Sequence, residues 1–357
     1  MTKNKKYNII LVKGVNILII FPNKISNNCT IGITATSSGT EDARSLNRLT
    51  HAIQNMKNAG FNIIETDNVR KCDKLASSSG KTRSEEFLSL WNNQEVEYII
   101  AKSGGEFLME MIPYLHKEKL QLGNPKWVQG FSDTSLLLYY LTTNYNIATV
   151  EASNFTEYSA RVWHDSMKNN LNILKNASTF SQENFEKYEA YPISWEEGKE
   201  LEPYNLTETV IYKSLDDEPC VSMEGRLIGG TIDTIKTIIG TEYDNTINFC
   251  KQFKEGILWH LENCELNVPD LYRALWQMKE AKWFENATGI IIGRTMSNSS
   301  VGDFTYEDAL ENIFRDLKIP VIYGVDFGHL APRWTLINGS FAKFKYENGK
   351  GKIQQEL

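Results

Sequence analysis

Ser132 occupies the kind of position from which a serine hydroxyl can act as a nucleophile. It lies in residues 129–135 (QGFSDTS), between a short β-prone stretch at 126–128 and an apolar run at 136–141. The first stretch predicts a strand and the second a buried helix, so the serine would lie on a tight strand-to-helix turn. Such a turn holds the hydroxyl clear of the sheet and points the first helical N–H groups at the reacting atoms. The motif suits acyl transfer, although a serine before a helix is also an ordinary N-cap.

Other turns at predicted strand ends carry groups that acyl transfer needs. Gly104 and Gly105 follow a predicted strand and would let backbone N–H groups approach a ligand closely, although a plain tight turn is the alternative. Glu262 ends the apolar strand predicted at 257–261, and Glu265 follows three residues later. Either acid could orient a base, and either could equally be a surface charge.

His329 follows Gly328 on the turn after the strand predicted at 321–325. A histidine there is placed like a general base, although a solvated loop histidine is the alternative. A serine hydroxyl needs a base to take its proton, and an imidazole titrates near neutral pH. An acid would fix the tautomer of the imidazole and stabilise its cation. The chain order of Ser132, Glu262 and His329 therefore predicts a catalytic triad, provided that the three meet in space.

The elements that must position these residues alternate between strand and helix. From about residue 29 the pattern predicts strands at 30–35, 61–66 and 96–102, and helices at 42–59, 83–92 and 107–115. Such alternation indicates an α/β fold with a parallel sheet covered on both faces. Ligands bind beyond the carboxyl ends of such strands.

The pattern weakens between about 145 and 219, where a helix at 159–174 and a linker are predicted. Residues 223–239 then predict a strand, a Gly-Gly turn and a helix. Further strands are expected at 257–261, 289–293 and 321–325, and further helices at 270–281 and 306–317.

Composition excludes several classes of protein. The 357 residues exceed what one core usually fills, so two domains are expected. The net charge of −7 argues against nucleic-acid or anionic-membrane partners. Five scattered cysteines without a C-x-x-C pair fit free thiols in a reducing compartment such as the cytoplasm, and no motif proposes a metal or cofactor. Residues 1–28 are expected to be an extra strand or a disordered extension, since the apolar stretch at 9–21 is too short to span a bilayer.

Blocks of sequence in a fixed order resemble the LD-carboxypeptidase family of serine peptidases, which includes the microcin C immunity peptidases. They cover nearly everything after residue 28. The blocks are Gly104-Gly105, Ile112-Pro113-Tyr114-Leu115, Asn124-Pro125-Lys126, Gly130-Phe131-Ser132-Asp133, Gly225-Arg226-Leu227-Ile228-Gly229-Gly230, Gly240-Thr241-Glu242-Tyr243, Gly256-Ile257-Leu258-Trp259-His260-Leu261-Glu262 and Phe327-Gly328-His329. One departure is the segment after the nucleophile helix, where residues 149–155 read TVEASNF and the family has a Gly-Pro pair.

The resemblance implies roles for these residues. Ser132 would be the nucleophile, Glu262 the acid and His329 the base, with Glu265 kept as a rival acid. Backbone N–H groups of Gly105 and Asp133 would form the oxyanion hole.

The resemblance also implies the architecture. A Rossmann-like parallel-sheet domain at 29–185 would carry the serine, with a linker from about 186. A smaller α/β domain at 210–357 would supply the acid and the histidine. The active site would lie at the domain junction, and a homodimer is expected.

Three functions are consistent with the sequence. The first is a cytoplasmic LD-type carboxypeptidase that removes a terminal D-amino acid from a muropeptide or other small peptide. Its substrate carboxylate would need a cation, for which Arg226, Arg273 and Arg294 are candidates, with Gly104 also at the substrate. The second is a hydrolase of microcin-C-like peptidyl adenylates, whose purine would stack on Trp163 or Trp195 unless these tryptophans serve only in packing. The third is a non-catalytic binding protein on the same fold.

Overall fold

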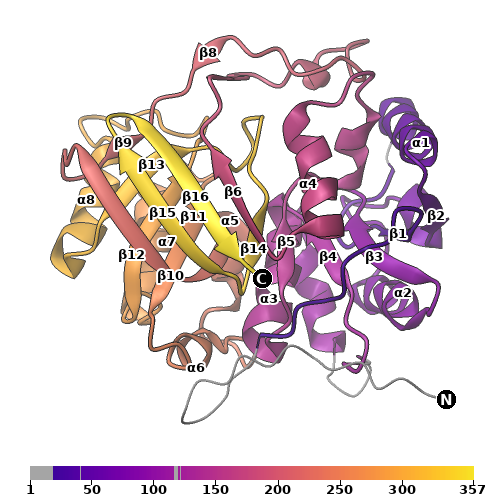
Figure 1. The fold of residues 1–357 in the computed structure, drawn as a ribbon, viewed down its shortest axis with the longest axis horizontal. Coiled ribbons are helices and arrows are strands. Elements are labelled where there is room, and N and C mark those ends of the chain that lie inside the picture. The colour runs from indigo at the N-terminus through magenta and orange to yellow at the C-terminus, as the bar shows by residue number, and fades with distance from the viewer. Residues whose placement is uncertain (1–18, 41, 116–119, 121) are drawn as a thin grey trace.

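Two β-sheets lie beside one another and together position the predicted site (Figure 1). The protein is represented by a computed structural model that describes residues 19–40, 42–115, 120 and 122–357. The first sheet has six strands in the order β14-β5-β4-β3-β1-β2, and the second has eight in the order β6-β16-β15-β10-β11-β12-β13-β9.

The first sheet is parallel through β5, and β14 joins its edge in the antiparallel direction. Its strands are β1 (Thr30–Thr34), β2 (Asn62–Glu65), β3 (Val96–Ala101), β4 (Trp127–Gly130), β5 (Thr149–Glu151) and β14 (Leu336–Asn338). Its helices are α1 (Ala43–Asn58), α2 (Gly80–Asn92), α3 (Ser135–Tyr145) and α4 (Asp165–Asn176). Since β14 comes from late in the chain, residues 336–338 return to the first sheet before β15 and β16 complete the second.

Local sequence explains where α1 begins and ends. The Asp42 side chain accepts the Ser45 N–H, and the Ser45 hydroxyl oxygen accepts the Asp42 N–H, which closes a capping box. Gly60 follows the helix with φ +93°, the left-handed conformation in which glycine commonly ends a helix. These signals confirm the helix predicted at 42–59.

The second sheet is parallel only at its centre, through β10 to β13. Antiparallel strands flank that centre on both sides. Its strands are β6 (Thr179–Glu183), β9 (Lys213–Ser214), β10 (Cys220–Thr231), β11 (Ile257–Glu262), β12 (Ala287–Gly293), β13 (Val321–Val325), β15 (Phe341–Glu347) and β16 (Lys350–Glu356). The main helices beside it are α7 (Val268–Glu280) and α8 (Tyr306–Phe314), with shorter helices α5 (Ile232–Ile235) and α6 (Thr246–Cys250). A small ribbon, β7 (Lys187–Tyr188) with β8 (Glu208–Thr209), lies in the segment predicted as a linker.

The structure confirms the α/β class and corrects several elements. The Gly-Gly turn predicted after residue 223 is wrong, because Gly229 and Gly230 lie inside β10. A Cβ on Gly229 would lie 1.7 Å from the carbonyl oxygen of His260, so the glycine permits close strand contact rather than a turn. The helix predicted at 107–115 is a 3₁₀ helix, η2 (Leu108–Tyr114), and the one predicted from residue 159 begins at 165.

The predicted domain limits near 185 and 210 stay predictions. Residues 1–18 lie outside the described residues, so most of the 1–28 expectation does too. At residue 20 the expected extra strand is limited to one parallel bridge, between Ile20 and Ile147.

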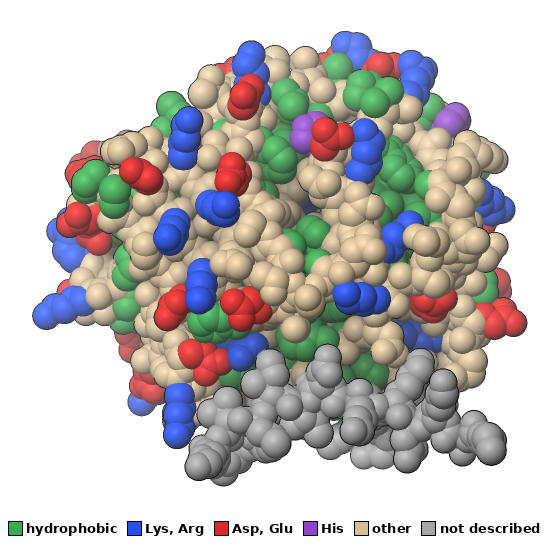
Figure 2. Space-filling model, in the orientation of Figure 1, with side chains coloured by type: hydrophobic (Ala, Val, Ile, Leu, Met, Phe, Trp, Pro, Cys, Tyr) green, Lys and Arg blue, Asp and Glu red, His purple; other side chains and the backbone are tan. Residues whose placement is uncertain are grey.

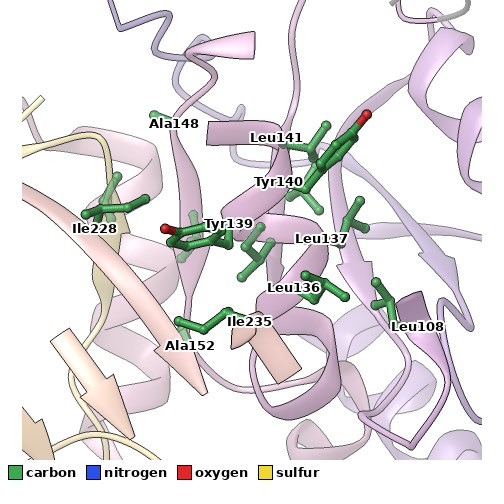
Figure 3. Close-up of a cluster of buried hydrophobic side chains, with 14 of the residues drawn as sticks. Leu108, Leu136, Leu137, Tyr139, Tyr140, Leu141, Ala148, Ala152, Ile228 and Ile235 are labelled. Atoms are coloured by element: carbon green, nitrogen blue, oxygen red, sulfur yellow. The ribbon is translucent and has the colours of Figure 1, made fainter. Parts of the chain in front are cut away.

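Helix α3 packs against both sheets and fixes one relative to the other. Its side chains lie between Leu108 of η2 and Ile228 of β10 within one buried apolar cluster (Figure 3). Tyr139 stacks on Trp283 with ring centroids 5.3 Å apart, and its hydroxyl pairs with Thr246 at 2.7 Å. Burying such large aromatic side chains contributes several kcal/mol to the free energy of folding. Because α3 follows directly after the turn at Ser132, this packing holds that turn in a fixed place relative to the second sheet.

The surface carries both signs of charge. On the face shown in Figure 2, Lys and Arg side chains are interspersed with Asp and Glu, and no dense basic area is visible there. In the described part of the chain, no helix is both long enough and apolar enough to cross a bilayer.

Candidate active site

The turn that carries Ser132 is strained in the way that a nucleophile turn requires. β4 ends at Gly130, and Ser132 has φ +65° at the start of a 3₁₀ turn, η4 (Ser132–Thr134), that leads into α3. A non-glycine residue in this region costs about 1–3 kcal/mol and persists only where its surroundings hold it. Close packing of Gly104 helps to hold it, since a Cβ there would lie 2.7 Å from Ser132 Oγ. Ser132 is therefore more than a helix cap.

The imidazole of His329 lies between the other two predicted triad residues. Its Nε2 is 3.0 Å from Ser132 Oγ, and its Nδ1 is 2.8 Å from Glu262 Oε1. The backbone N–H of His329 also donates to Glu262 Oε1, at 3.3 Å. Gly328 permits this approach, because a Cβ there would lie 2.3 Å from Glu262 Cγ and φ is +95°. The structure thus brings together three side chains that lie far apart in the sequence.

Glu262 and not Glu265 faces the histidine. The Glu262 side chain is only 3% exposed, and its second oxygen, Oε2, accepts the Thr231 hydroxyl at 3.1 Å. The backbone of Glu265 is held instead by Asp233, whose Oδ1 accepts its N–H at 2.8 Å, and Glu265 is exposed. A fully hydrogen-bonded, buried carboxylate can fix the imidazole tautomer in a way that a solvated one cannot.

A buried ion pair supports the loop that carries His329. Arg294 pairs with Asp326, and it also donates to the carbonyl oxygens of Leu330 at 2.8 Å and Pro332 at 2.7 Å. The Tyr212 hydroxyl donates to Asp326 at 2.6 Å. Removing one partner of such a pair costs about 3–5 kcal/mol, because the other charge is left buried and unpaired. Arg294 therefore holds the loop in place, and its expected contact with substrate stays a prediction.

The electrostatics of the site favour a strong base at His329. Burial lowers the pKa of the imidazole, but the charge and hydrogen bond of Glu262 outweigh burial and raise that pKa above its ordinary value. At Asp133, burial raises the pKa of the carboxyl to about 6. Asp133 accepts the Ser37 hydroxyl and the Leu108 N–H, and so ties the turn that carries Ser132 to its neighbours.

A cavity of about 340 Å³ opens beside Ser132 and His329. It is lined by Ser38, Gly39, Ser45, Arg48, Lys102, Ser103, Gly104, Gly105, Phe131, Ser132, Asn154, Thr156, Glu157 and His329. Gly105 has φ +147°, and a Cβ on Gly104 would lie 3.5 Å from the Asp133 nitrogen. The Gly-Gly turn therefore abuts the first N–H groups of η4, next to the serine. This size suits a small ligand.

Two of the other predicted substrate residues lie elsewhere. Arg226 lies in the middle of β10, paired in register with Ile257 at the start of β11, and it donates to Glu255 at 2.7 Å and to the Gly339 carbonyl at 3.0 Å. Arg226 therefore lies five residues along β10 from Thr231, which bonds to Glu262, and its expected contact with substrate stays a prediction. Arg273 is an exposed residue of α7 paired with Asp270.

The two candidate tryptophans differ. Trp163 packs edge-on against Tyr158, and its indole donates to the Tyr158 carbonyl at 2.9 Å, which favours the packing role. Trp195 is 44% exposed. Its segment is held against α1, because Arg44 donates to the Ser194 carbonyl. Since α1 also supplies Ser45 and Arg48 to the cavity, Trp195 belongs to a segment fixed beside a cavity wall.

The sequence did not indicate Arg48, Lys102 or Glu157 as cavity residues. Arg48 lies on a predicted helix that begins just after the carboxyl end of β1, and ligand binding beyond strand ends was the one available signal. Its guanidinium donates to the Thr156 carbonyl at 3.4 Å, and its Nε has no partner among the residues the structure describes.

One group of potential metal ligands occurs among the described residues. Glu262, Cys264 and His329 offer atoms within 4.8 Å of one another. Burial raises the pKa of the Cys264 thiol well above its usual range, which keeps it protonated, while the other two side chains already bond to each other. The donor set fits proton transfer better than metal binding.

Two protein-family models match the chain. The model of the LD-carboxypeptidase N-terminal domain matches residues 31–152, and that of its C-terminal domain matches residues 224–344. The chain belongs to the LD-carboxypeptidase family. Membership makes it a hydrolase of the serine peptidase type, and together the two matches span more than half of the sequence.

Curated relatives extend over most of the chain. The microcin C7 self-immunity protein MccF of Escherichia coli is 25% identical over 339 residues, which is 92% of this chain and 93% of that protein. A putative carboxypeptidase of Vibrio cholerae is 26% identical over 317 residues, covering 86% of this chain and 90% of the relative.

Solved structures share the fold. The microcin C7 self-immunity protein in complex with aspartyl sulfamoyl adenosine has a TM-score of 0.80 at 23% identity, and covers 95% of this chain and 99% of that one. An MccF-like protein from Bacillus anthracis has a TM-score of 0.79 at 19% identity, with the same coverage.

Proposed function

We propose that this member of the LD-carboxypeptidase family is a serine carboxypeptidase that hydrolyses the bond to a terminal D-amino acid in a muropeptide. The observation that carries the proposal is the continuous contact from Ser132 through His329 to Glu262, at the wall of a cavity that also contains Arg48. A cation beside a nucleophile suits a peptide that ends in a free carboxylate.

The proposed mechanism uses the three side chains in fixed roles. His329 Nε2 removes the proton of Ser132 Oγ, which attacks the scissile carbonyl and forms a tetrahedral intermediate. The imidazolium, stabilised by Glu262, gives that proton to the departing amine, and an acyl-enzyme on Ser132 remains. Water then attacks this ester with His329 again as base, which releases the shortened peptide and restores the serine.

The oxyanion of each tetrahedral intermediate needs hydrogen-bond donors. The proposed donors are the backbone N–H groups of Gly105 and Asp133, because the Gly-Gly turn and the start of η4 meet beside Ser132 Oγ. Loss of one such donor typically costs about 10²–10³ in turnover.

The raised pKa of His329 predicts the acid limb of the pH profile. Only the neutral imidazole accepts the serine proton, so kcat/KM should fall as the pH drops through a midpoint above the ordinary histidine value of about 6.5. The same raised pKa affects stability. The ion pair between His329 and Glu262 stabilises the fold fully at a pH below the pKa of this histidine in the unfolded chain, and that contribution is lost as the pH rises through the pKa of His329 in the folded protein. Measuring kcat/KM between about pH 5 and 9 checks the limb. A midpoint below 6.5 would contradict the proposed base.

Replacement of Arg48 should weaken substrate binding. Arg48→Met keeps much of the side chain length but removes the charge. A lost charge-assisted hydrogen bond of about 1.5–3 kcal/mol corresponds to a rise in KM of roughly 10- to 100-fold. Steady-state kinetics on a tetrapeptide should show this rise with a smaller change in kcat. The matched control is Arg273→Met, on the exposed face of α7, and an equal effect of both variants would remove Arg48 from the site.

A second candidate is hydrolysis of an aminoacyl or peptidyl adenylate, with toxin resistance as its outcome. It is supported by the likeness to MccF over 92% of the chain, and by the exposed Trp195 on a segment held beside α1. An exposed indole next to a cavity could stack a purine.

Parallel assays separate the two candidates. One assay follows release of the terminal D-alanine from a muramoyl tetrapeptide, and the other follows cleavage of an aminoacyl sulfamoyl adenosine. The proposal predicts a higher kcat/KM for the tetrapeptide and little effect of Trp195→Ala on it. A preference for the adenylate that is lost in Trp195→Ala would favour the second candidate.

The expected homodimer and cytoplasmic location stay predictions, which sedimentation and cell fractionation would check.

A further inference from the structure

Glu151 is a buried carboxyl group that the proposed mechanism does not use. It lies at the end of β5, paired in register with Gly130 of β4 and with Leu336 of β14. Its Oε1 is 2.5 Å from the Ser135 hydroxyl, and its Oε2 is buried with no hydrogen-bond partner among the described residues. An ionised carboxylate in such a place would leave one oxygen desolvated and unpaired, which is costly.

A chain of hydroxyl groups connects Glu151 to the triad. Ser135 Oγ lies 3.2 Å from Thr231 Oγ1, and Thr231 Oγ1 donates to Glu262 Oε2 at 3.1 Å. Glu262 Oε1 in turn bonds to His329. Two hydroxyls therefore lie between one buried carboxyl group and the triad acid.

The number of available hydrogens decides whether Glu151 is protonated. The row of groups from Glu151 to Glu262 contains three contacts: Glu151 with Ser135, Ser135 with Thr231, and Thr231 with Glu262. The two hydroxyls supply only two hydrogens, so an ionised Glu151 leaves one contact between oxygen lone pairs without a hydrogen. A protonated Glu151 supplies the third, and every group can then donate in one direction that ends on the Glu262 carboxylate.

We propose that Glu151 is a protonated positioning residue, which orders the hydroxyls of Ser135 and Thr231 so that both point toward the triad acid. This inference rests on the proposed function of Glu262. Glu151 touches no reacting atom and acts through Glu262 alone. Its ionisation would draw the Ser135 hydrogen away, and Thr231 would then divide its hydrogen between Ser135 and Glu262.

The electrostatic surroundings agree with the proton count. Burial is the largest influence and raises the pKa of Glu151 to about 8, while the Ser135 hydrogen bond lowers it. The charged groups that face it are Glu262, which raises the pKa further, and Arg333, which lowers it. The carboxyl group is therefore neutral at pH 7 and ionises at mildly alkaline pH.

Infrared spectroscopy tests the protonation directly and does not depend on activity. Wild-type protein at pH 7 should show the carbonyl band of a protonated carboxylic acid, and the band should disappear as the pH rises through about 8. Glu151→Gln should lack the band. The control is Glu189→Gln, which changes another buried carboxyl group that accepts the Ile193 and Asn205 N–H bonds, and it should keep the band. The same spectrum in wild type and Glu151→Gln at pH 7 would overturn the proposal.

Kinetics test the link to the triad. A glutamine amide can donate to Ser135 as a protonated Glu151 would, so Glu151→Gln should keep kcat at pH 7 within about threefold. Wild-type kcat should fall by roughly tenfold above the pKa of Glu151, and that alkaline limb should be absent in Glu151→Gln. Thr231→Val should lose roughly tenfold in kcat at every pH, with little change in KM, and Thr231→Ser should restore it. An alkaline limb unchanged in Glu151→Gln would overturn the inference.

The two tests also separate this inference from the proposed function. If the carboxyl band is present but neither substrate is hydrolysed, the proposed function fails and the protonated Glu151 stands. If turnover is normal and the band is missing, the inference fails alone.

Discussion

Ser132→Ala should abolish turnover while leaving the fold intact. The substitution removes the atom that would form the acyl-enzyme, and in serine peptidases such a change lowers kcat by about 10⁴–10⁶. Alanine occupies the same φ +65° turn with one atom fewer, so the midpoint of thermal unfolding should move by only a few degrees. Steady-state rates on the tetrapeptide, with thermal unfolding of the same samples, measure both quantities.

Ser340→Ala is the matched control for this experiment. Ser340 is another buried serine, whose hydroxyl donates to Gln355 at 3.2 Å in the second sheet. Its replacement should leave kcat within about twofold of wild type and cost about 1 kcal/mol of stability. Turnover by Ser132→Ala within tenfold of wild type would contradict the assignment of the nucleophile.

Glu262→Gln should produce the second large loss, of about 10⁴ in kcat. The amide keeps the shape of the side chain but removes the charge that stabilises the imidazolium of His329. It can also present an N–H to Nδ1, which would favour the wrong tautomer of the ring. The pKa of His329 should fall as well, since the Glu262 charge and hydrogen bond are what raise it against burial. Titration of the His329 ring by NMR measures this change separately from the rate.

Glu265→Gln separates the two acids that the sequence left open. Glu265 is exposed and does not bond to His329, so its replacement should change kcat by less than about threefold. A loss of turnover in Glu265→Gln but not in Glu262→Gln would contradict the geometry of the site.

The sequence predicted the parts of the fold that have strong local signals. Strands such as 96–101, helix 43–58 with its cap, and the strand-to-helix turn at Ser132 all depend on residues close together in the chain. The meeting of Ser132, Glu262 and His329 is different, because it depends on α3 packing against both sheets. Chain order and strand ends could suggest that meeting but could not establish it.

Other features depend on long-range contacts and were missed or misassigned. The strands at 341–347 and 350–356 alternate buried residues with more exposed ones, yet their place between β10 and β6 follows from pairing with distant strands. The glycines at 229–230 suggested a turn because the close contacts of Gly229 with His260 of β11, and of Gly230 with Ser135 of α3, are invisible in the sequence. Arg226 was a candidate because a substrate carboxylate needs a cation, but its place in the middle of β10, five residues from Thr231, depends on strand pairing that the sequence does not show. Arg48 was overlooked because a cationic residue in an amphipathic helix has no distinguishing local signal.

The central claim is that Ser132 is an activated nucleophile, and a serine-directed fluorophosphonate probe tests it most directly. Peptide mass spectrometry after labelling should find one modified residue, Ser132, in wild-type protein. Labelling should be lost in Ser132→Ala and strongly slowed in Glu262→Gln. A folded wild-type protein that remains unlabelled, or an adduct on a different serine, would contradict the account and favour a protein that binds its ligand without cleaving it.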